Sequence, residues 1–346
     1  MCFHRIALGL TLAINLIANA TTAFEIEDRR VYTATPERGV LRIISTADLE
    51  VFDPILRAFQ EQNPSLSIDY SVAGTTELMK AIYDEGAVFD LVISSAMDLQ
   101  TKLANDGFAQ SYSSAATTAL PAWASWRDQL FAFTQEPAVL IVSNAFFTPD
   151  TTPQNRDALI ALLRESPDRF TGRIGTYDVR SSGFGYLVAT QDSRNSEAFW
   201  RLMEVMGRLD AQLYCCSGDM IRDVASGKLA LAYNVLGSYA ASQMATTQGF
   251  QIIELTDFVN VMLRTALIPV NAQNVQDAQD MVDFLSLLNT RQDLVTSTGL
   301  PAIDTTSLQE NTALRPIRFG PGLLVFLDQM KRRNFLRNWE NSLFQE

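Results

Sequence analysis

The sequence predicts an α/β protein of two lobes, each a mostly parallel sheet flanked by helices, joined by a hinge of two strands. Buried strands alternate with amphipathic helices along the chain, and this order is typical of parallel sheets. The 346 residues are enough for two hydrophobic cores. Hydrophobic residues make up 47% and charged residues 19% of the chain, which is the composition of a folded protein.

The N-terminus, residues 1–23, has the pattern of a secretory signal peptide. Arg5 precedes an apolar run at 6–17, and small residues then suit cleavage after Ala20 or Ala23. The run is shorter than the roughly 20 residues that span a bilayer, although an N-terminal membrane anchor is the alternative. We expect a periplasmic protein.

Charge and residue usage exclude several classes of function. The formal net charge is −12, and the one basic run is Lys331–Arg333, so we expect no nucleic-acid partner and no membrane insertion. The one histidine, His4, lies in the predicted signal, so histidine-based general-base, triad and zinc chemistry is missing from the mature chain. We expect a monomer that is not an enzyme and has no cofactor or metal.

Two of the three cysteines, Cys215 and Cys216, are adjacent. Adjacent cysteines do not suit an ordinary structural disulfide. Two reduced thiols, a vicinal disulfide and an intermolecular pairing all fit the sequence.

The first lobe is predicted to begin with three strand-and-helix units. Each strand is a short apolar run, and each helix has apolar residues at helical spacing. The predicted strands are 40–45, 67–72 and 89–93, and the helices that follow them are 48–62, 77–84 and 97–106.

The second lobe is predicted at 138–255, between two hinge strands near 130–142 and 255–269. Residues 40–135 and 270–346 form the first lobe, and two terminal helices near 323–331 and 335–343 pack outside. Two chain crossings are what a hinged cleft requires. The elements predicted in the second lobe are strands 173–177, 229–234 and 250–255, and helices 155–164, 196–207 and 238–246.

Hydroxyl side chains follow three predicted strands of the first lobe. They are Ser45 and Thr46, then Thr75 and Thr76, then Ser94 and Ser95. In parallel sheets, ligands bind beyond the carboxyl ends of the strands, where these turns fall. Each turn alone is also an ordinary helix cap. Three turns at equivalent positions predict a shared crevice.

The segment 172–188 has a strand, a polar turn and a helix start in succession. Such a turn directs backbone N–H groups toward an anion. Arg180, Ser181 and Ser182 add donors, and Gly183 allows a close backbone approach. We expect these residues to form an anion clamp, with Tyr233 and Asn234 contacting hydroxyl groups or a sugar face of the ligand.

Several segments in this order resemble the periplasmic solute-binding proteins of ABC transporters, in the ferric-iron-type branch. The resemblance runs from about Leu41 to Thr298. It implies the type II periplasmic binding fold, in which two lobes close on a ligand. The segments are LRIISTADLEVFDPILRAFQEQNP, VAGTTELMKAI, FDLVISSAMDLQTKLANDGF, FTGRIGTYDVRSSGFGYLVA and VASGKLALAYNVLGSYA.

The positions that bind iron in that branch are changed in this sequence. The resemblance implies a histidine where Asp48 stands, a glutamate at Ser95 or Ala96, and a tyrosine pair within 235–238. Ferric iron needs several anionic oxygen ligands, which these positions do not supply. The basic residue often found at the hinge is replaced by Glu136.

Other members of the branch bind phosphorylated compounds, and the chain is nearest in character to the phosphoglycerate and hexose-phosphate regulatory proteins. The resemblance therefore implies capture of a small anionic organic ligand, phosphorylated or carboxylated, for an ABC importer permease or a two-component sensor kinase. A ferric-iron-binding protein and a sensor or interaction subunit with a degenerate cleft are the alternatives.

Overall fold

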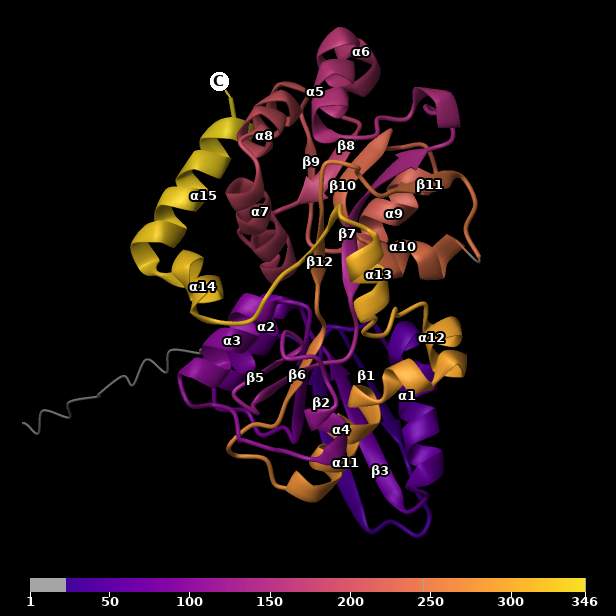
Figure 1. Cartoon of the computed structure of the whole chain (residues 1–346), viewed down its shortest axis with the longest axis vertical. Helices are drawn as coiled ribbons and strands as arrows, with labels where there is room; N and C mark the ends of the chain where they lie inside the picture. The colour runs from indigo at the N-terminus through magenta and orange to yellow at the C-terminus, as the bar shows by residue number, and fades with distance from the viewer. Residues whose placement is uncertain (1–22, 245, 346) are drawn as a thin grey trace, which may run out of the picture.

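The computed structural model describes residues 23–244 and 246–345, and it has two lobes joined by two chain crossings (Figure 1). The chain leaves the first lobe between β6 (Leu130–Ala132) and β7 (Glu136–Ser143) and returns between β12 (Val259–Met262) and β13 (Thr265–Leu267). Of the predicted signal peptide, only Ala23 falls within the described residues. No helix in these ranges is both long and apolar enough to cross a bilayer.

The first lobe is built on a seven-stranded mixed sheet with the order β1-β3-β2-β4-β13-β6-β5. Only β2 runs parallel to its neighbours β3 and β4, and the other pairs are antiparallel. The parallel pairs therefore lie within the strand-and-helix units of β2, β3 and β4. Strand β13, which enters from the other lobe, is antiparallel to β4 and β6. The remaining strands are β1 (Asp28–Tyr32), β2 (Gly39–Ser45), β3 (Leu66–Val72), β4 (Leu91–Ser94) and β5 (Ser125–Trp126).

The second lobe has a mixed sheet with the order β14-β12-β7-β10-β8-β9, and β11 pairs with β7. Strand β8 is parallel to β9 and β10, whereas β7 is antiparallel to β10, β11 and β12. These strands are β8 (Ile174–Tyr177), β9 (Gln212–Tyr214), β10 (Leu231–Leu236), β11 (Phe250–Ile253) and β14 (Leu314–Pro316).

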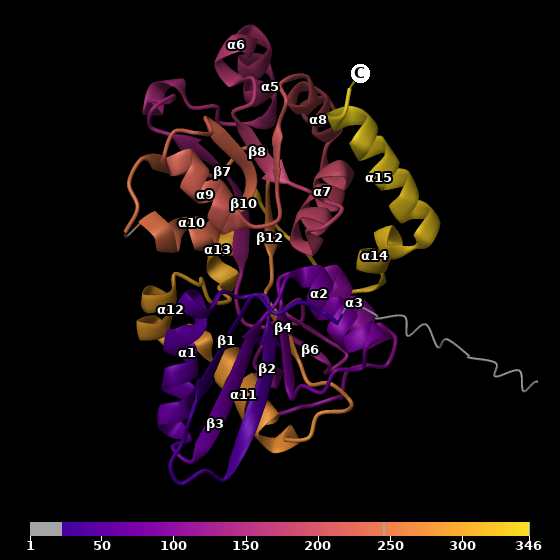
Figure 2. The same cartoon turned by 180° about the vertical axis from the view of Figure 1, so that it is seen from behind.

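Helices cover both faces of each sheet, and their apolar sides form the cores. In the first lobe, Phe52 and Phe59 of α1 pack with Met281 of α11 against the sheet. Helices α2 and α3 lie at the lobe boundary below α7 (Figure 2). The helices are α1 (Leu49–Gln62), α2 (Thr75–Met79) with the π-helical η1 (Lys80–Asp84), α3 (Met97–Asn105), α4 (Ala115–Thr118), α5 (Arg156–Glu165), α6 (Pro167–Phe170), α7 (Gly183–Asn195), α8 (Ala198–Arg208), α9 (Ser217–Ala225), α10 (Gly237–Met244), α11 (Val275–Ser286), α12 (Gln292–Thr298), α13 (Thr305–Glu310), α14 (Pro321–Leu324) and α15 (Gln329–Leu343); the short 3-10 turns are η2 (Pro149–Thr151), η3 (Leu288–Thr290) and η4 (Val325–Leu327).

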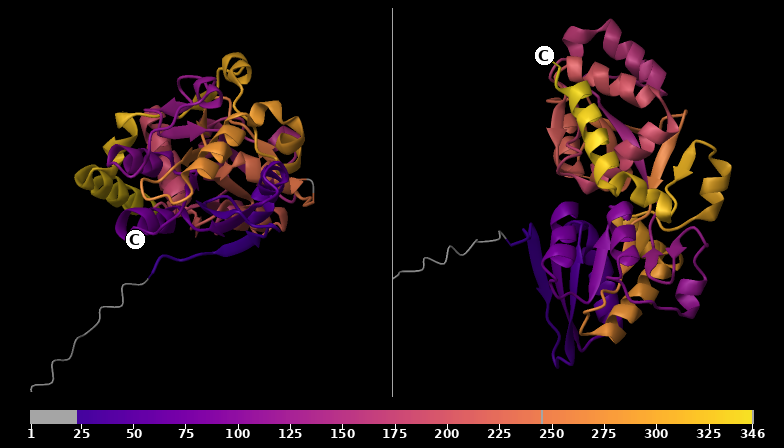
Figure 3. Two further views of the ribbon diagram at one scale, coloured as in Figure 1. Left: turned by 90° about the horizontal axis from the view of Figure 1, so that it is seen from below. Right: turned by 90° about the vertical axis from the view of Figure 1, so that its left-hand side faces the viewer.

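The C-terminal segment differs from the prediction that placed all of 270–346 in the first lobe. Helices α11 and α12 do pack there, but β14 pairs with β12, and α15 lies along α8 of the second lobe (Figure 3). Phe335, Trp339 and Leu343 form an apolar stripe at four-residue spacing and are buried in the second core. The same stripe makes α15 one helix where the sequence predicted two.

Candidate ligand-binding site

A small cavity of about 90 Å³ lies between the lobes, at the carboxyl ends of β2, β4 and β8. Its lining comes from both lobes and is rich in hydroxyl groups. The lining residues are Glu27, Thr46, Asp48, Ala73, Gly74, Thr75 and Ser95 on one side, and Tyr177, Ser182, Phe184, Cys215, Cys216, Ser217, Gly218, Leu236 and Tyr239 on the other.

In the pairs Ser45–Thr46 and Ser94–Ser95, the first hydroxyl bonds to the backbone and the second lines the cavity. Ser45 Oγ accepts a hydrogen bond from the Ala47 N–H at 3.0 Å, and Ser94 Oγ accepts one from the Ala96 N–H at 3.1 Å. Both of these serines are buried and close their own turns. The following residues, Thr46 and Ser95, line the cavity, and their hydroxyl oxygens lie 3.3 Å apart. The second hydroxyl of each pair is therefore the one available to a ligand.

The turn before α7 touches the first lobe directly. The Gly183 N–H donates to Thr75 Oγ1 at 2.7 Å, and Thr76 Oγ1 donates to the Ser181 carbonyl at 3.2 Å. Ser182 is the N-cap of α7, where its hydroxyl accepts from the Gly185 N–H at 3.1 Å, and it also lines the cavity. These contacts hold the two lobes together at the mouth of the cleft.

Two carboxylates, Asp48 and Glu27, also border the cavity. The surrounding protein partly excludes water and raises the pKa of both side chains, while the Arg264 guanidinium opposes this rise at Asp48. The Asp48 N–H donates to the Tyr239 hydroxyl of the other lobe at 2.9 Å. The site can therefore accept hydrogen bonds as well as donate them.

Arg264 is a functional candidate that the sequence analysis missed. It lies on the second chain crossing, is fully buried, and forms an ion pair with Glu136 of the first crossing. The hinge therefore does carry a basic residue. Its Nη1 has no hydrogen-bond partner within the described residues. A lone arginine in the apolar stretch 259–269 was the available signal, because a buried charge requires a partner.

Arg180 does not lie in this cavity. Its Nε and Nη2 donate to Asp178 Oδ1 and Oδ2 at 2.8 and 2.6 Å, and its side chain is 42% exposed. The guanidinium also lies over the Trp339 and Phe344 rings. Asp178, two residues earlier in the sequence, therefore binds the guanidinium group that we expected to bind a ligand.

Tyr233 and Asn234 also lie away from the cavity, in a buried network inside the second lobe. The Tyr233 hydroxyl and the Asn234 amide donate to Asp192 Oδ2 at 2.6 and 2.8 Å. Arg156 donates to the Tyr233 hydroxyl at 2.6 Å. Asn234 has a φ of 63°, and the pairing register of β10 with β7 shifts between Ala232 and Val235. This bulge turns both side chains toward the core.

Cys215 and Cys216 form a disulfide that borders the cleft. Strand β9 ends at Tyr214, and Cys216 is the N-cap of α9, so the disulfide occupies the turn after a strand, as Ser95 does in the first lobe. Among the pairings that the sequence left open, the structure has the vicinal disulfide.

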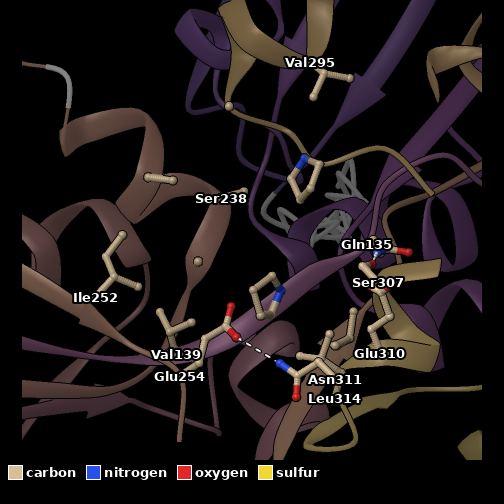
Figure 4. A pocket seen from close by; sticks show the side chains of 16 residues that line it. Gln135, Val139, Ser238, Ile252, Glu254, Val295, Ser307, Glu310, Asn311 and Leu314 are labelled. Carbon is tan, nitrogen blue, oxygen red and sulfur yellow. Dashed lines mark hydrogen bonds between the residues drawn. The ribbon is translucent and has the colours of Figure 1, made fainter. Parts of the chain in front are cut away.

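Two larger cavities lie elsewhere in the molecule. The first, about 670 Å³, lies at the hinge beside β7 and α10, and its polar lining includes Glu254 and Glu310 (Figure 4). The second, about 490 Å³, separates α3 from α15. Its lining includes the predicted site residues Thr76, Arg180 and Gly183, the further cations Lys102 and Arg332, and the carboxylates Asp84 and Asp98. The described residues contain no group of three or more His, Cys, Asp or Glu side chains placed to share a metal ion.

Comparisons with known proteins show the family and the fold. A model of the family "Bacterial extracellular solute-binding protein" matches residues 41–299. The substrate-binding protein of an ABC transporter from Agrobacterium tumefaciens is 31% identical, with a TM-score of 0.86 over 91% of this chain and 98% of that one. No curated protein sequence matches.

More distant structures share the fold. The fructose-6-phosphate-bound protein AfuA from Actinobacillus pleuropneumoniae is 14% identical, with a TM-score of 0.68 over 90% of this chain and all of that one. Iron-bound HitA from Pseudomonas aeruginosa is 15% identical, with a TM-score of 0.66 over 88% and 99% of the two chains. The chain thus has the type II periplasmic binding fold, and it belongs to the bacterial extracellular solute-binding proteins, a non-catalytic family whose members serve ABC transporters.

Proposed function

We propose that the chain captures a small anionic organic ligand, phosphorylated or carboxylated, in the cavity between its lobes. The observation that carries this proposal is the meeting of helix N-termini there. The N-cap residues of α1, α2, α7 and α9 all line the cavity, and they are Asp48, Gly74, Ser182 and Cys216. Backbone N–H groups and helix dipoles at such ends stabilise negative charge.

Hydroxyl groups complete the proposed anion site. Thr46, Thr75, Ser95 and Ser182 come from both lobes, so a ligand that bridges them favours closure. A phosphate or carboxylate oxygen accepts several such hydrogen bonds at once, each worth about 1.5–3 kcal/mol when the acceptor is charged.

Asp48 and Glu27 narrow the ligand class. Carboxylates repel an anion that has acceptors alone, and they accept hydrogen bonds from hydroxyl or amino groups. The ligand we propose therefore carries such donors next to its anionic group. A cavity of about 90 Å³ suits a compound of a few carbon atoms.

The partner we propose is the permease of an ABC importer, with the protein exported to the periplasm by its predicted signal. A two-component sensor kinase is the alternative partner. Ferric iron is the alternative ligand. It suits the lining less well, because neutral hydroxyls outnumber the two carboxylates, Asp48 and Glu27.

The test is a thermal-shift screen of the mature protein against inorganic phosphate, phosphoglycerates, hexose phosphates, hydroxy- and aminocarboxylates, and ferric iron. A ligand at 100 times its Kd stabilises the protein by about 2.7 kcal/mol, which shifts the Tm visibly. Stabilisation by a phosphorylated or carboxylated compound supports the proposal. Stabilisation by iron alone or by nothing in the panel contradicts it.

A pair of serine variants then locates the site. Ser95→Ala removes a hydroxyl from the cavity and is expected to raise the Kd of the compound found at least tenfold. Ser181→Ala removes an exposed hydroxyl outside that cavity and serves as the matched control. Equal Kd values for both variants would place the ligand elsewhere.

A further inference from the structure

The Cys215–Cys216 disulfide forms part of the cleft wall. Both cysteines are exposed, and they line the same cavity as Thr46 and Asp48 of the opposite lobe. The disulfide therefore borders the space that a ligand enters. Exposed disulfides of this kind are open to thiol exchange, unlike those buried in a core.

The disulfide has apolar side chains among its neighbours in the wall. Phe184 and Leu236 of the same lobe line the cavity with it. That lobe also contributes hydroxyls, among them those of Ser182 and Tyr239, and Thr46 and Ser95 contribute theirs from the other lobe. An organic anion has two unlike parts, a charged group and a carbon skeleton. The N–H and hydroxyl groups suit the first, and the disulfide with its apolar neighbours suits the second.

The S–S bond also determines where the two sulfur atoms lie. Cys216 has an extended backbone, with φ −137° and ψ 148°. In extended chain, neighbouring side chains point to opposite sides, so the bond is what keeps both sulfurs together. The next residue, Ser217, is anchored because the Leu236 N–H donates to its hydroxyl at 3.3 Å and the Tyr177 hydroxyl contacts it. Breaking the bond therefore alters the wall directly beside the N-terminus of α9.

We propose that this disulfide is a ligand-contacting element of the cleft and that its reduction by a dithiol weakens ligand binding. The inference rests on the proposed function of the cleft. A thiolate of the dithiol attacks one cysteine sulfur and breaks the S–S bond. The second thiol of the reductant then displaces the first cysteine and closes a cyclic disulfide. Two electrons and two protons thus pass to Cys215 and Cys216, which become thiols.

The experiment compares the oxidised protein with protein reduced by dithiothreitol. Outside the predicted signal, Cys215 and Cys216 are the only cysteines in the sequence, so the reductant acts at this pair alone. Iodoacetamide labelling and mass spectrometry confirm zero and two free thiols in the two forms. Calorimetry then gives the Kd of glycerol 3-phosphate and of every compound that the thermal-shift panel identifies. Hydrogen exchange reports on the 214–220 segment without any ligand.

The expected result is a Kd at least tenfold higher in the reduced form, together with faster exchange at 214–220 and unchanged exchange in the first-lobe sheet. The Cys215→Ser/Cys216→Ser variant should bind like the reduced protein and should not respond to dithiothreitol. Equal Kd values in the two forms would overturn the inference, and so would equal exchange at 214–220. Failure of every anion to bind either form contradicts the proposed function instead, and the exchange comparison still decides whether the disulfide positions the wall.

Discussion

Arg264 and Glu136 join the two chain crossings of the hinge through a buried, two-pronged ion pair. Arg264 Nε donates to Glu136 Oε1 at 2.9 Å, and Nη2 donates to Oε2 at 3.1 Å. Neither side chain is exposed to solvent. Thr134 and Ser238 also donate to the same carboxylate. The two crossings are therefore joined by charge as well as by backbone pairing.

Removing the charge of Glu136 should strongly destabilise the protein. Glu136→Gln leaves the buried Arg264 without a counter-charge, and breaking such a pair costs about 3–5 kcal/mol. Guanidinium unfolding of the two proteins measures the difference. The control is Glu204→Gln, which breaks an exposed pair with Arg208 and should change stability by less than about 1 kcal/mol. A Glu136→Gln protein as stable as this control would contradict the prediction.

Lobe closure should be sensitive to one methyl group at Gly183. A Cβ there would lie 2.7 Å from Thr75 Oγ1 and 2.9 Å from Thr75 Cβ, on the opposite lobe. Parting the lobes relieves this contact, so Gly183→Ala should favour the open form and weaken ligand binding about tenfold, at an overpacking cost of roughly 1–3 kcal/mol. Small-angle scattering and calorimetry measure the two effects.

Gly322 offers the matched control for that substitution. A Cβ on Gly322 meets no atom within 4 Å, so Gly322→Ala should scatter and bind like the wild type. If Gly183→Ala also gave the wild-type scattering curve and Kd, the Thr75 contact would not limit closure.

The sequence predicted the edge of the sheet at which the candidate site lies, but not all of its residues. Thr46, Thr75 and Ser95 line one cavity because the turns after the parallel strands of the first lobe meet at one edge, and Ser182 faces them from the second lobe. The sequence could not show which hydroxyl of a pair faces the cavity, since that depends on the turn. Ser45 and Ser94 bond to the backbone two residues later, a choice that only coordinates reveal.

Long-range partners explain the other differences. Arg264 and Glu136 are 128 positions apart, and no local pattern pairs them. Arg180 fits an anion clamp until Asp178 is seen to bind its guanidinium. Strand β9 has only three residues, too short for an alternating pattern, so the position of the cysteines beside the cleft was not visible.

Tyr233 should matter for stability and not for ligand binding. Its hydroxyl lies between Arg156 and Asp192, with 2.6 Å to each partner, in the core of the second lobe. Tyr233→Phe leaves a buried Arg156 N–H without a partner, at a cost of about 1–3 kcal/mol, while the Kd stays unchanged. Tyr83→Phe, whose hydroxyl bonds to Asp106 near the surface, should cost less. If Tyr233→Phe changed the Kd of the ligand, the prediction would be wrong and Tyr233 would belong to the ligand site.

Asp98 should make the protein less stable as the pH rises toward neutrality. It is 3% exposed, beside the cavity that separates α3 from α15, and burial raises its pKa from 3.8 to about 7, although Arg332 opposes this rise. Because the folded state binds this proton more tightly than the unfolded state, the stability it contributes is complete below about pH 4 and is lost as the pH rises through 7. The full loss is of the order of 4 kcal/mol.

Asp98→Asn keeps an oxygen for the Leu99 N–H and cannot ionise, so its stability should fall less between pH 5 and pH 8 in guanidinium unfolding. Asp150→Asn, at an exposed position, should follow the wild type, and parallel profiles for wild type and Asp98→Asn would show that Asp98 is ionised throughout this range.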